Sequence, residues 1–144
     1  MNPTDARSPQ LEADLWPDLE GFDAAAARQC CGNSVQVFGR LLGLLQKSYG
    51  SWQVTWLESA QANAALNTTS PDTTALCASL HKLRGSASTM GAFHLARVAE
   101  EAESLLRQRR ESPAEAIQRV GAVLDELLGR AQAWQAATQT REEP

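Results

Sequence analysis

The sequence predicts an all-α protein built as an antiparallel four-helix bundle. Proline, which disrupts helix interiors, is absent from residues 18–70 and 72–112, so long helices are permitted. The chain is rich in Ala, Leu, Gln, Glu and Arg, and it has few of the β-branched or aromatic runs that favour strands. Its 144 residues match the length of one domain, about 100–150 residues.

Capping residues mark the first two helices. Asp23 can cap a short helix over residues 24–31, which Gly32-Asn33 would end. Ser34 or Asn33 can cap the next helix, which runs to about Ser48. We expect the short N-terminal helix, or helices, to cover one end of the bundle. The apolar stripe of the longer helix comprises Val35, Phe38, Leu41, Leu42 and Leu45.

Turn signals divide the rest of the chain. Gly50-Ser51 separates a third helix from the second, and the polar residues 67–69 form a loop before Ser70-Pro71 opens a fourth. Gly91 ends that helix. Ser112-Pro113-Ala114-Glu115 is a capping box with proline at the first helical position. The third to sixth expected helices therefore begin near residues 51, 71, 92 and 113. The helix that begins at 71 is expected to end near residue 90, and the one that begins at 92 is expected to end near residue 110.

Composition and charge exclude several classes of protein. The net charge of −4 lacks the basic footprint of nucleic-acid or anionic-membrane binding, and no apolar run approaches the roughly 20 residues of a membrane span. Three cysteines, two of them adjacent at Cys30 and Cys31, make a poor disulfide framework. We expect a cytoplasmic, monomeric bundle over residues 15–137, with flexible polar segments at 1–14 and 138–144.

One segment of the fourth helix combines residues that suggest chemistry. At about 100° per residue, His81 lies about 100° from the centre of the core stripe, so one ring nitrogen can meet solvent. Arg84 at i+3 places a guanidinium beside the imidazole, which suits a neutral histidine that will carry an anion. Gly85 costs the helix roughly 1 kcal/mol relative to alanine, and with the small residues through Ser88 it opens the surface to a docking partner. The core stripe comprises Leu76, Leu80, Leu83, Ala87 and Met90.

These residues resemble the signature of histidine-containing phosphotransfer (HPt) domains. The run His81-Lys82-Leu83-Arg84-Gly85-Ser86-Ala87, followed by Gly91-Ala92 and Leu95, is similar to the family pattern His-x-Leu-Lys/Arg-Gly-Ser-Ser/Ala and then Gly-Ala-x-x-Leu. The stretch 19–23 before an Ala-rich helix resembles the usual lead-in, and the resemblance spans about 15–130. It implies a phosphorelay intermediate, either the C-terminal module of a hybrid sensor kinase at the membrane or a freestanding shuttle.

The resemblance implies a role for each residue of this segment. His81 would accept a phosphoryl group at Nε2 from the aspartyl phosphate of a receiver domain and pass it to the aspartate of a response regulator. Arg84 would steady the phosphoryl oxygens with help from Lys82, although an Arg offers a planar fork where the commoner Lys offers a point charge. Gly85 and Ser88 would give the receivers access.

On the next helix, the resemblance implies two supporting residues. Glu103 falls where the family places a Gln or Glu that accepts from the histidine Nδ1–H, which leaves Nε2 nucleophilic. Arg107 is an auxiliary cation. No cofactor or metal is implied, and the chain has no glycine-rich phosphate loop, so we expect a phosphotransfer module and not an enzyme with its own nucleotide site.

Two other interpretations stay open. The chain could be phosphorylated directly by an ATP-binding kinase domain, as in chemotaxis kinases, or it could be a helical adaptor that does no phosphotransfer.

His94, near a helix start, is expected to be a surface residue. Residues 81–110 hold six Lys or Arg against three Glu, whereas the first 23 residues hold six acids and one base. A basic face beside His81 would steer docking of an acidic receiver.

Overall fold

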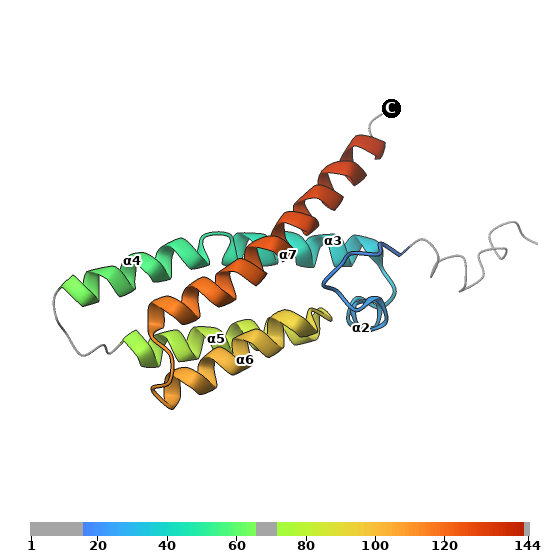
Figure 1. Cartoon of the computed structure of the whole chain (residues 1–144). Coiled ribbons are helices and arrows are strands. Elements are labelled where there is room, and N and C mark those ends of the chain that lie inside the picture. Colours follow the sequence, from blue (N-terminus) through green and yellow to red (C-terminus); the bar gives the residue numbers. More distant parts are fainter. Residues whose placement is uncertain (1–15, 66–71, 143–144) are drawn as a thin grey trace, which may run out of the picture.

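Helices make up all the regular structure that a computed structural model describes, over residues 16–65 and 72–142 (Figure 1). The all-α prediction is confirmed. No helix in these ranges is long and apolar enough to cross a membrane. The predicted segment 1–14, the loop at 67–69 and the Ser70-Pro71 cap lie outside the described residues. The helices are α2 (Ala24–Cys30), α3 (Val35–Tyr49), α4 (Trp52–Ala65), α5 (Asp72–Thr89), α6 (Phe93–Arg107) and α7 (Pro113–Glu142).

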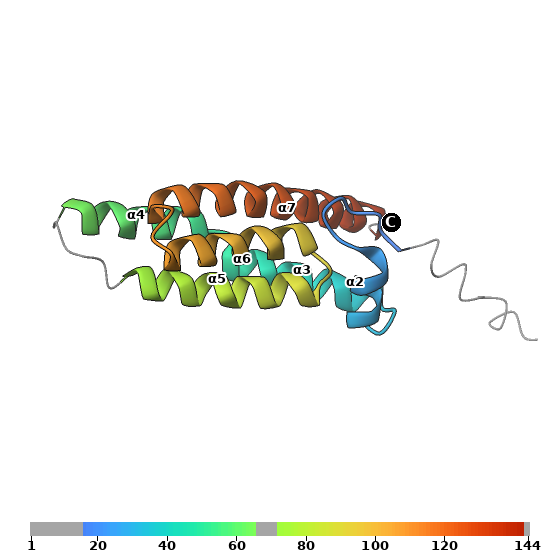
Figure 2. The ribbon, with the colours of Figure 1, turned by 60° about the horizontal axis from the view of Figure 1, so that its bottom comes forward.

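The bundle has four long helical positions, because α3 and α4 lie end to end and share one of them (Figures 1 and 2). The break between them is slight: Gly50 keeps helical angles, with φ −59° and ψ −31°, and its N–H donates to the Gln46 carbonyl at 2.8 Å. The other positions are α5, α6 and α7, and neighbours in sequence run antiparallel. The short helix α2 covers the end where α5 turns into α6 (Figure 2). The predicted bundle, with a short N-terminal helix at one end, is confirmed.

Local chemistry sets several of the predicted boundaries. The side chains of Asp23, Ser34 and Ser112 each accept a hydrogen bond from the backbone N–H three residues later, at 2.9, 3.2 and 3.2 Å. These bonds satisfy N–H groups that have no partner within the helix. After α2, Gly32 and Asn33 both have positive φ, 59° and 64°, which ends the helix.

Other boundaries differ from the prediction. Helix α6 ends at Arg107 and not near residue 110, because Arg109 has φ +58°, which a right-handed helix does not allow. Helix α7 continues to Glu142, so residues 138–142, predicted to be part of a flexible tail, are helical. Loss of apolar periodicity does not end a helix when its backbone hydrogen bonds continue and no proline intervenes, and here the next proline is Pro144.

The core confirms the predicted stripe of α5. Its members are at most 6% exposed: Leu76, Leu80, Leu83, Ala87 and Met90. Tryptophans serve packing, as expected. Trp52 is buried and donates from Nε1 to the Ser79 hydroxyl at 2.9 Å, which joins α4 to α5. Trp16 and Trp134 flank Phe38, with ring centroids 5.2 and 5.8 Å from it.

The turn at Gly91 sets how α6 lies against α5. Gly91 has φ +82°, and a Cβ there would come within 2.7 Å of the Asp23 carbonyl oxygen, so only glycine fits. In return, the Asp23 N–H donates to the Gly91 carbonyl at 2.8 Å. The lead-in to α2 is thereby tied to the turn, and α5 and α6 pack along their whole lengths (Figures 1 and 2). The facing surfaces of these two helices carry the candidate site.

Candidate functional site

His81 lies in the middle of α5 and projects from the edge of the core. Its neighbours in sequence on the core side, Leu80 and Leu83, are fully buried, whereas 65% of the His81 side chain is exposed. This is the position that the helical geometry predicts. A partly exposed imidazole can reach a bound partner without any rearrangement of the bundle.

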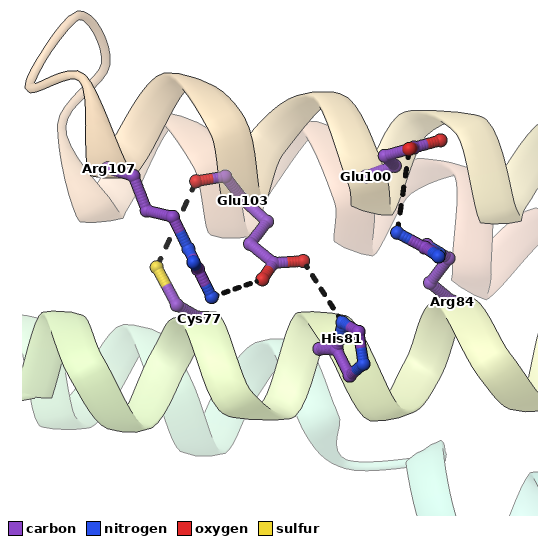
Figure 3. Close-up of polar contacts among 6 residues, drawn as sticks. All are labelled: Cys77, His81, Arg84, Glu100, Glu103 and Arg107. Carbon is purple, nitrogen blue, oxygen red and sulfur yellow. Dashed lines mark hydrogen bonds and ion pairs between the residues drawn. The ribbon is translucent and has the colours of Figure 1, made fainter.

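Glu103 faces His81 from α6. Its Oε2 lies 3.6 Å from His81 Nδ1, and its side chain is only 10% exposed (Figure 3). The second ring nitrogen, Nε2, lies on the far side of the ring from Glu103 (Figure 3). A carboxylate near Nδ1 favours the tautomer in which Nδ1 carries the proton and Nε2 has the free lone pair. The structure therefore brings together the two residues that the sequence pairs.

Arg107 is bonded to the same carboxylate. Its Nη2 lies 2.6 Å from Glu103 Oε1, one helical turn along α6 (Figure 3). This contact was not predicted, because the resemblance implies only an auxiliary cation near the site. The i,i+4 spacing of a glutamate and an arginine on one helix is the signal in the sequence that indicates such a pair.

The other two predicted cations point elsewhere in the free protein. The Arg84 Nη1 lies 3.5 Å from Glu100 Oε1 on α6, so its guanidinium reaches across to that helix and lies beside His81 on the side opposite Arg107 (Figure 3). Lys82 is exposed. Successive residues of a helix point about 100° apart, so the Lys82 side chain leaves α5 in a different direction from His81.

An apolar groove begins one turn beyond His81. Gly85 is exposed, and a Cβ placed on it would meet no atom of another element within 4 Å, so packing inside the bundle does not require glycine there. The groove runs between α5 and α3, and Leu44 on α3 is 58% exposed at it. Ser88 is exposed on α5. Sequence reasoning missed Leu44, whose position outside the core stripe of its helix was the available signal. The groove is lined by Cys30, Leu41, Leu44, Leu45, Ser48, Tyr49, Gly85, Ser86, Thr89 and Met90.

A second, more polar groove opens on the other side of His81. It lies between the first turns of α5 and the loop after α6, where Arg107, Arg109 and Arg110 line it together with Thr73 and Thr74. All three arginines are exposed. Three of the six basic residues that the sequence places around the site therefore lie at one end of the α5–α6 pair, where Glu111 and Glu115 also line the groove. Exposed arginines there can attract acidic surfaces.

The remaining titratable candidates take no part in the contact between His81 and Glu103. His94 is exposed near the start of α6. Cys77 is buried one turn before His81, with its Sγ 4.0 Å from the Glu103 carbonyl oxygen. Burial, with a smaller effect of Cys30, raises the pKa of the Cys31 thiol. Within residues 16–65 and 72–142, no three His, Cys, Asp or Glu residues come together in a way that could hold a metal ion.

Comparison with known proteins identifies the family. The family model for the Hpt domain matches residues 56–134, which is more than half of the chain and runs from α4 through most of α7. No curated protein and no solved structure matches the chain. The protein belongs to the Hpt domain family. Hpt domains are helical phosphotransfer modules of two-component signalling that lack a nucleotide-binding site of their own and interact with receiver domains.

Proposed function

We propose that this chain is a phosphorelay intermediate in which Nε2 of His81 carries the phosphoryl group. One observation supports this most strongly: an exposed imidazole has its Nδ1 3.6 Å from a carboxylate that is only 10% exposed, and its Nε2 faces away from that carboxylate (Figure 3). Burying a carboxylate costs free energy. A histidine at the edge of the bundle that had no chemical role would not require a buried carboxylate beside its ring.

The transfer is a displacement at phosphorus. The Nε2 lone pair forms an N–P bond while the P–O bond of the receiver's aspartyl phosphate breaks, and the aspartate leaves as a carboxylate. Nδ1 keeps its proton throughout. The imidazole ring gains positive charge as the N–P bond forms, and the Glu103 carboxylate stabilises that charge. Onward transfer reverses these steps at the aspartate of a response regulator.

Arg84 and Lys82 compensate the charge of about −2 that phosphorylation adds. The ion pair of Arg84 with Glu100 has an N–O distance of 3.5 Å and side chains that are 40% and 63% exposed. Exposed pairs of this kind contribute little to stability, so the guanidinium is free to turn from Glu100 to a phosphoryl group on His81. Lys82 is a flexible cation on the adjacent position.

The partner docks over α5, beside His81. Gly85 and Ser88 are small, so a partner can approach the backbone of α5 closely. The groove with exposed Leu44 offers an apolar contact of the kind that marks protein interaction sites. The arginines at the other groove attract the acidic active site of a receiver. We infer that the partners are receiver domains of a hybrid kinase and of a response regulator. Such partners act in the cytoplasm, and the chain binds them as a monomer.

A test with labelled ATP separates this function from the two alternatives. The chain is incubated with γ-labelled ATP and a histidine kinase domain, with and without each receiver domain encoded in the same genome. We expect label on the chain only when a receiver is present, loss of label in His81→Gln, and retention in His94→Gln. Label transferred directly from the kinase domain would favour the chemotaxis-kinase type. Absence of label with every receiver would favour an adaptor.

A further inference from the structure

Glu103 is a buried charged residue, with 8% of its surface exposed. Its carboxylate lies between two groups. Oε1 is 2.6 Å from Arg107 Nη2, and Oε2 is 3.6 Å from His81 Nδ1 (Figure 3). A buried carboxylate needs a compensating partner, and the exposed imidazole is the more distant of the two.

We infer that Arg107 is a positioning residue, which holds the Glu103 carboxylate in the orientation that directs Oε2 at His81 Nδ1. The inference rests on the proposed function and adds to it a role for Arg107, which acts on His81 through Glu103. The terminal torsion of a glutamate side chain is broad and has no strong preference of its own. A short, charge-assisted hydrogen bond to one oxygen fixes the plane of the carboxylate and with it the direction of the other oxygen.

The geometry indicates that Arg107 binds Glu103 and not the phosphoryl group. Its Nη2 is occupied by Oε1, and it approaches the carboxylate from the side opposite Arg84, with His81 between the two arginines (Figure 3). Within the part of the chain that the structure describes, Arg84 pairs with exposed Glu100 at 3.5 Å. The two arginines therefore have separate tasks: Arg84 can meet the phosphoryl oxygens, whereas Arg107 sets the tautomer of the ring before the phosphoryl group arrives.

The decisive measurement is the tautomer of His81 in the unphosphorylated chain. Ring ¹⁵N shifts are recorded in a His94→Gln background, which leaves one histidine, at about pH 8.5, where an ordinary imidazole is neutral. We expect the Nδ1–H tautomer to dominate. In Arg107→Gln, the ratio of Nδ1–H to Nε2–H should fall about threefold to tenfold, the range expected for loss of one hydrogen bond. Arg107→Lys should restore part of the ratio.

Two further variants make the test specific. Arg97→Gln removes an exposed arginine from the same helix and should leave the tautomer ratio unchanged. Glu103→Gln removes the charge that Arg107 binds, so Arg107→Gln made in that background should have little further effect. Equal effects of Arg107→Gln with and without Glu103 would overturn the inference, as would an unchanged ratio in the single variant. This readout needs no phosphotransfer, so it can fail or succeed independently of the proposed function.

A receiver-free reaction supplies the kinetic readout. Phosphoramidate is the probe: Nε2 attacks its phosphorus, the N–P bond to His81 forms, and the P–N bond to the leaving ammonia breaks. We expect Arg107→Gln to lower the rate at saturating phosphoramidate in proportion to the fraction of His81 in the Nδ1–H tautomer, which falls by a smaller factor than the tautomer ratio while that tautomer dominates, with the half-saturating concentration changed less than about twofold. A raised half-saturating concentration with an unchanged tautomer ratio would show that Arg107 binds the phosphoryl group, which contradicts the inference.

Discussion

Substitutions of Gly85 can separate effects on the stability of the chain from effects on phosphoryl transfer. It lies inside α5, is exposed, and has no atom of another element within 4 Å of the position a Cβ would take. Glycine in an exposed helix interior costs about 0.8–1.0 kcal/mol relative to alanine. Gly85→Ala should therefore raise the free energy of unfolding by about that amount, and the melting temperature by about 3–5 °C. Urea unfolding with an unchanged m-value checks this.

A larger side chain at the same position should block the partner and leave the histidine chemistry intact. Gly85→Gln places its side chain one turn from His81, at the groove that Leu44 lines. We expect phosphoryl transfer from a receiver to fall more than about tenfold, a loss of at least about 1.4 kcal/mol, because the receiver can no longer approach. Phosphorylation by phosphoramidate, a much smaller donor, should stay within about twofold of the unsubstituted chain.

Gly129 in α7 is the matched control. It is also exposed in a helix interior, and a Cβ added to it would have no atom of another element within 4 Å. Gly129→Ala should stabilise the chain as Gly85→Ala does, and Gly129→Gln should leave transfer from the receiver unchanged. The reasoning would be refuted if Gly85→Ala destabilised the chain, or if Gly85→Gln accepted phosphoryl groups from a receiver as fast as the unsubstituted chain.

Three other predictions concern the fold that supports the site. Leu80→Ala, at a fully buried position, should cost about 2–5 kcal/mol of unfolding free energy in urea titration; a loss under about 1 kcal/mol would mean that the core is not packed as described. Gly91→Ala should cost more than about 1 kcal/mol in the same assay, because φ is +82° and the Asp23 carbonyl lies 2.7 Å from the new Cβ; a neutral effect would contradict the described turn. Since burial raises the pKa of the Cys31 thiol, iodoacetamide at about pH 8 should modify exposed Cys30 first, and faster modification of Cys31 would contradict its burial.

The sequence predicts the fold well where boundaries depend on local chemistry. The caps at Asp23, Ser34 and Ser112 are readable because one side chain meets an N–H three residues away. The core stripe of α5 follows from a helical period alone. The end of α6 cannot be predicted in this way. Arg109 adopts a positive φ there, and arginine rarely does so, so the residue type gives no indication of the turn.

The site was predictable in its residues and not in its contacts. Helical geometry places His81 at the edge of the core, and the family pattern points to Glu103. Whether their side chains meet depends on how α5 and α6 pack, which the turn at Gly91 sets through a contact with distant Asp23. The exposure of Leu44 likewise depends on how several helices are assembled, whereas the bond of Arg107 to Glu103 lies within α6 and its i,i+4 spacing is visible in the sequence.

The position of the phosphoryl group tests the central claim most directly. The ¹⁵N-labelled chain is phosphorylated by a receiver, and ³¹P and ¹⁵N spectra are recorded before and after. We predict one N–P bond, at Nε2 of His81, with Nδ1 still protonated, and no such bond in His81→Gln. A phosphoryl group on His94, or on Nδ1 of His81, would contradict the account.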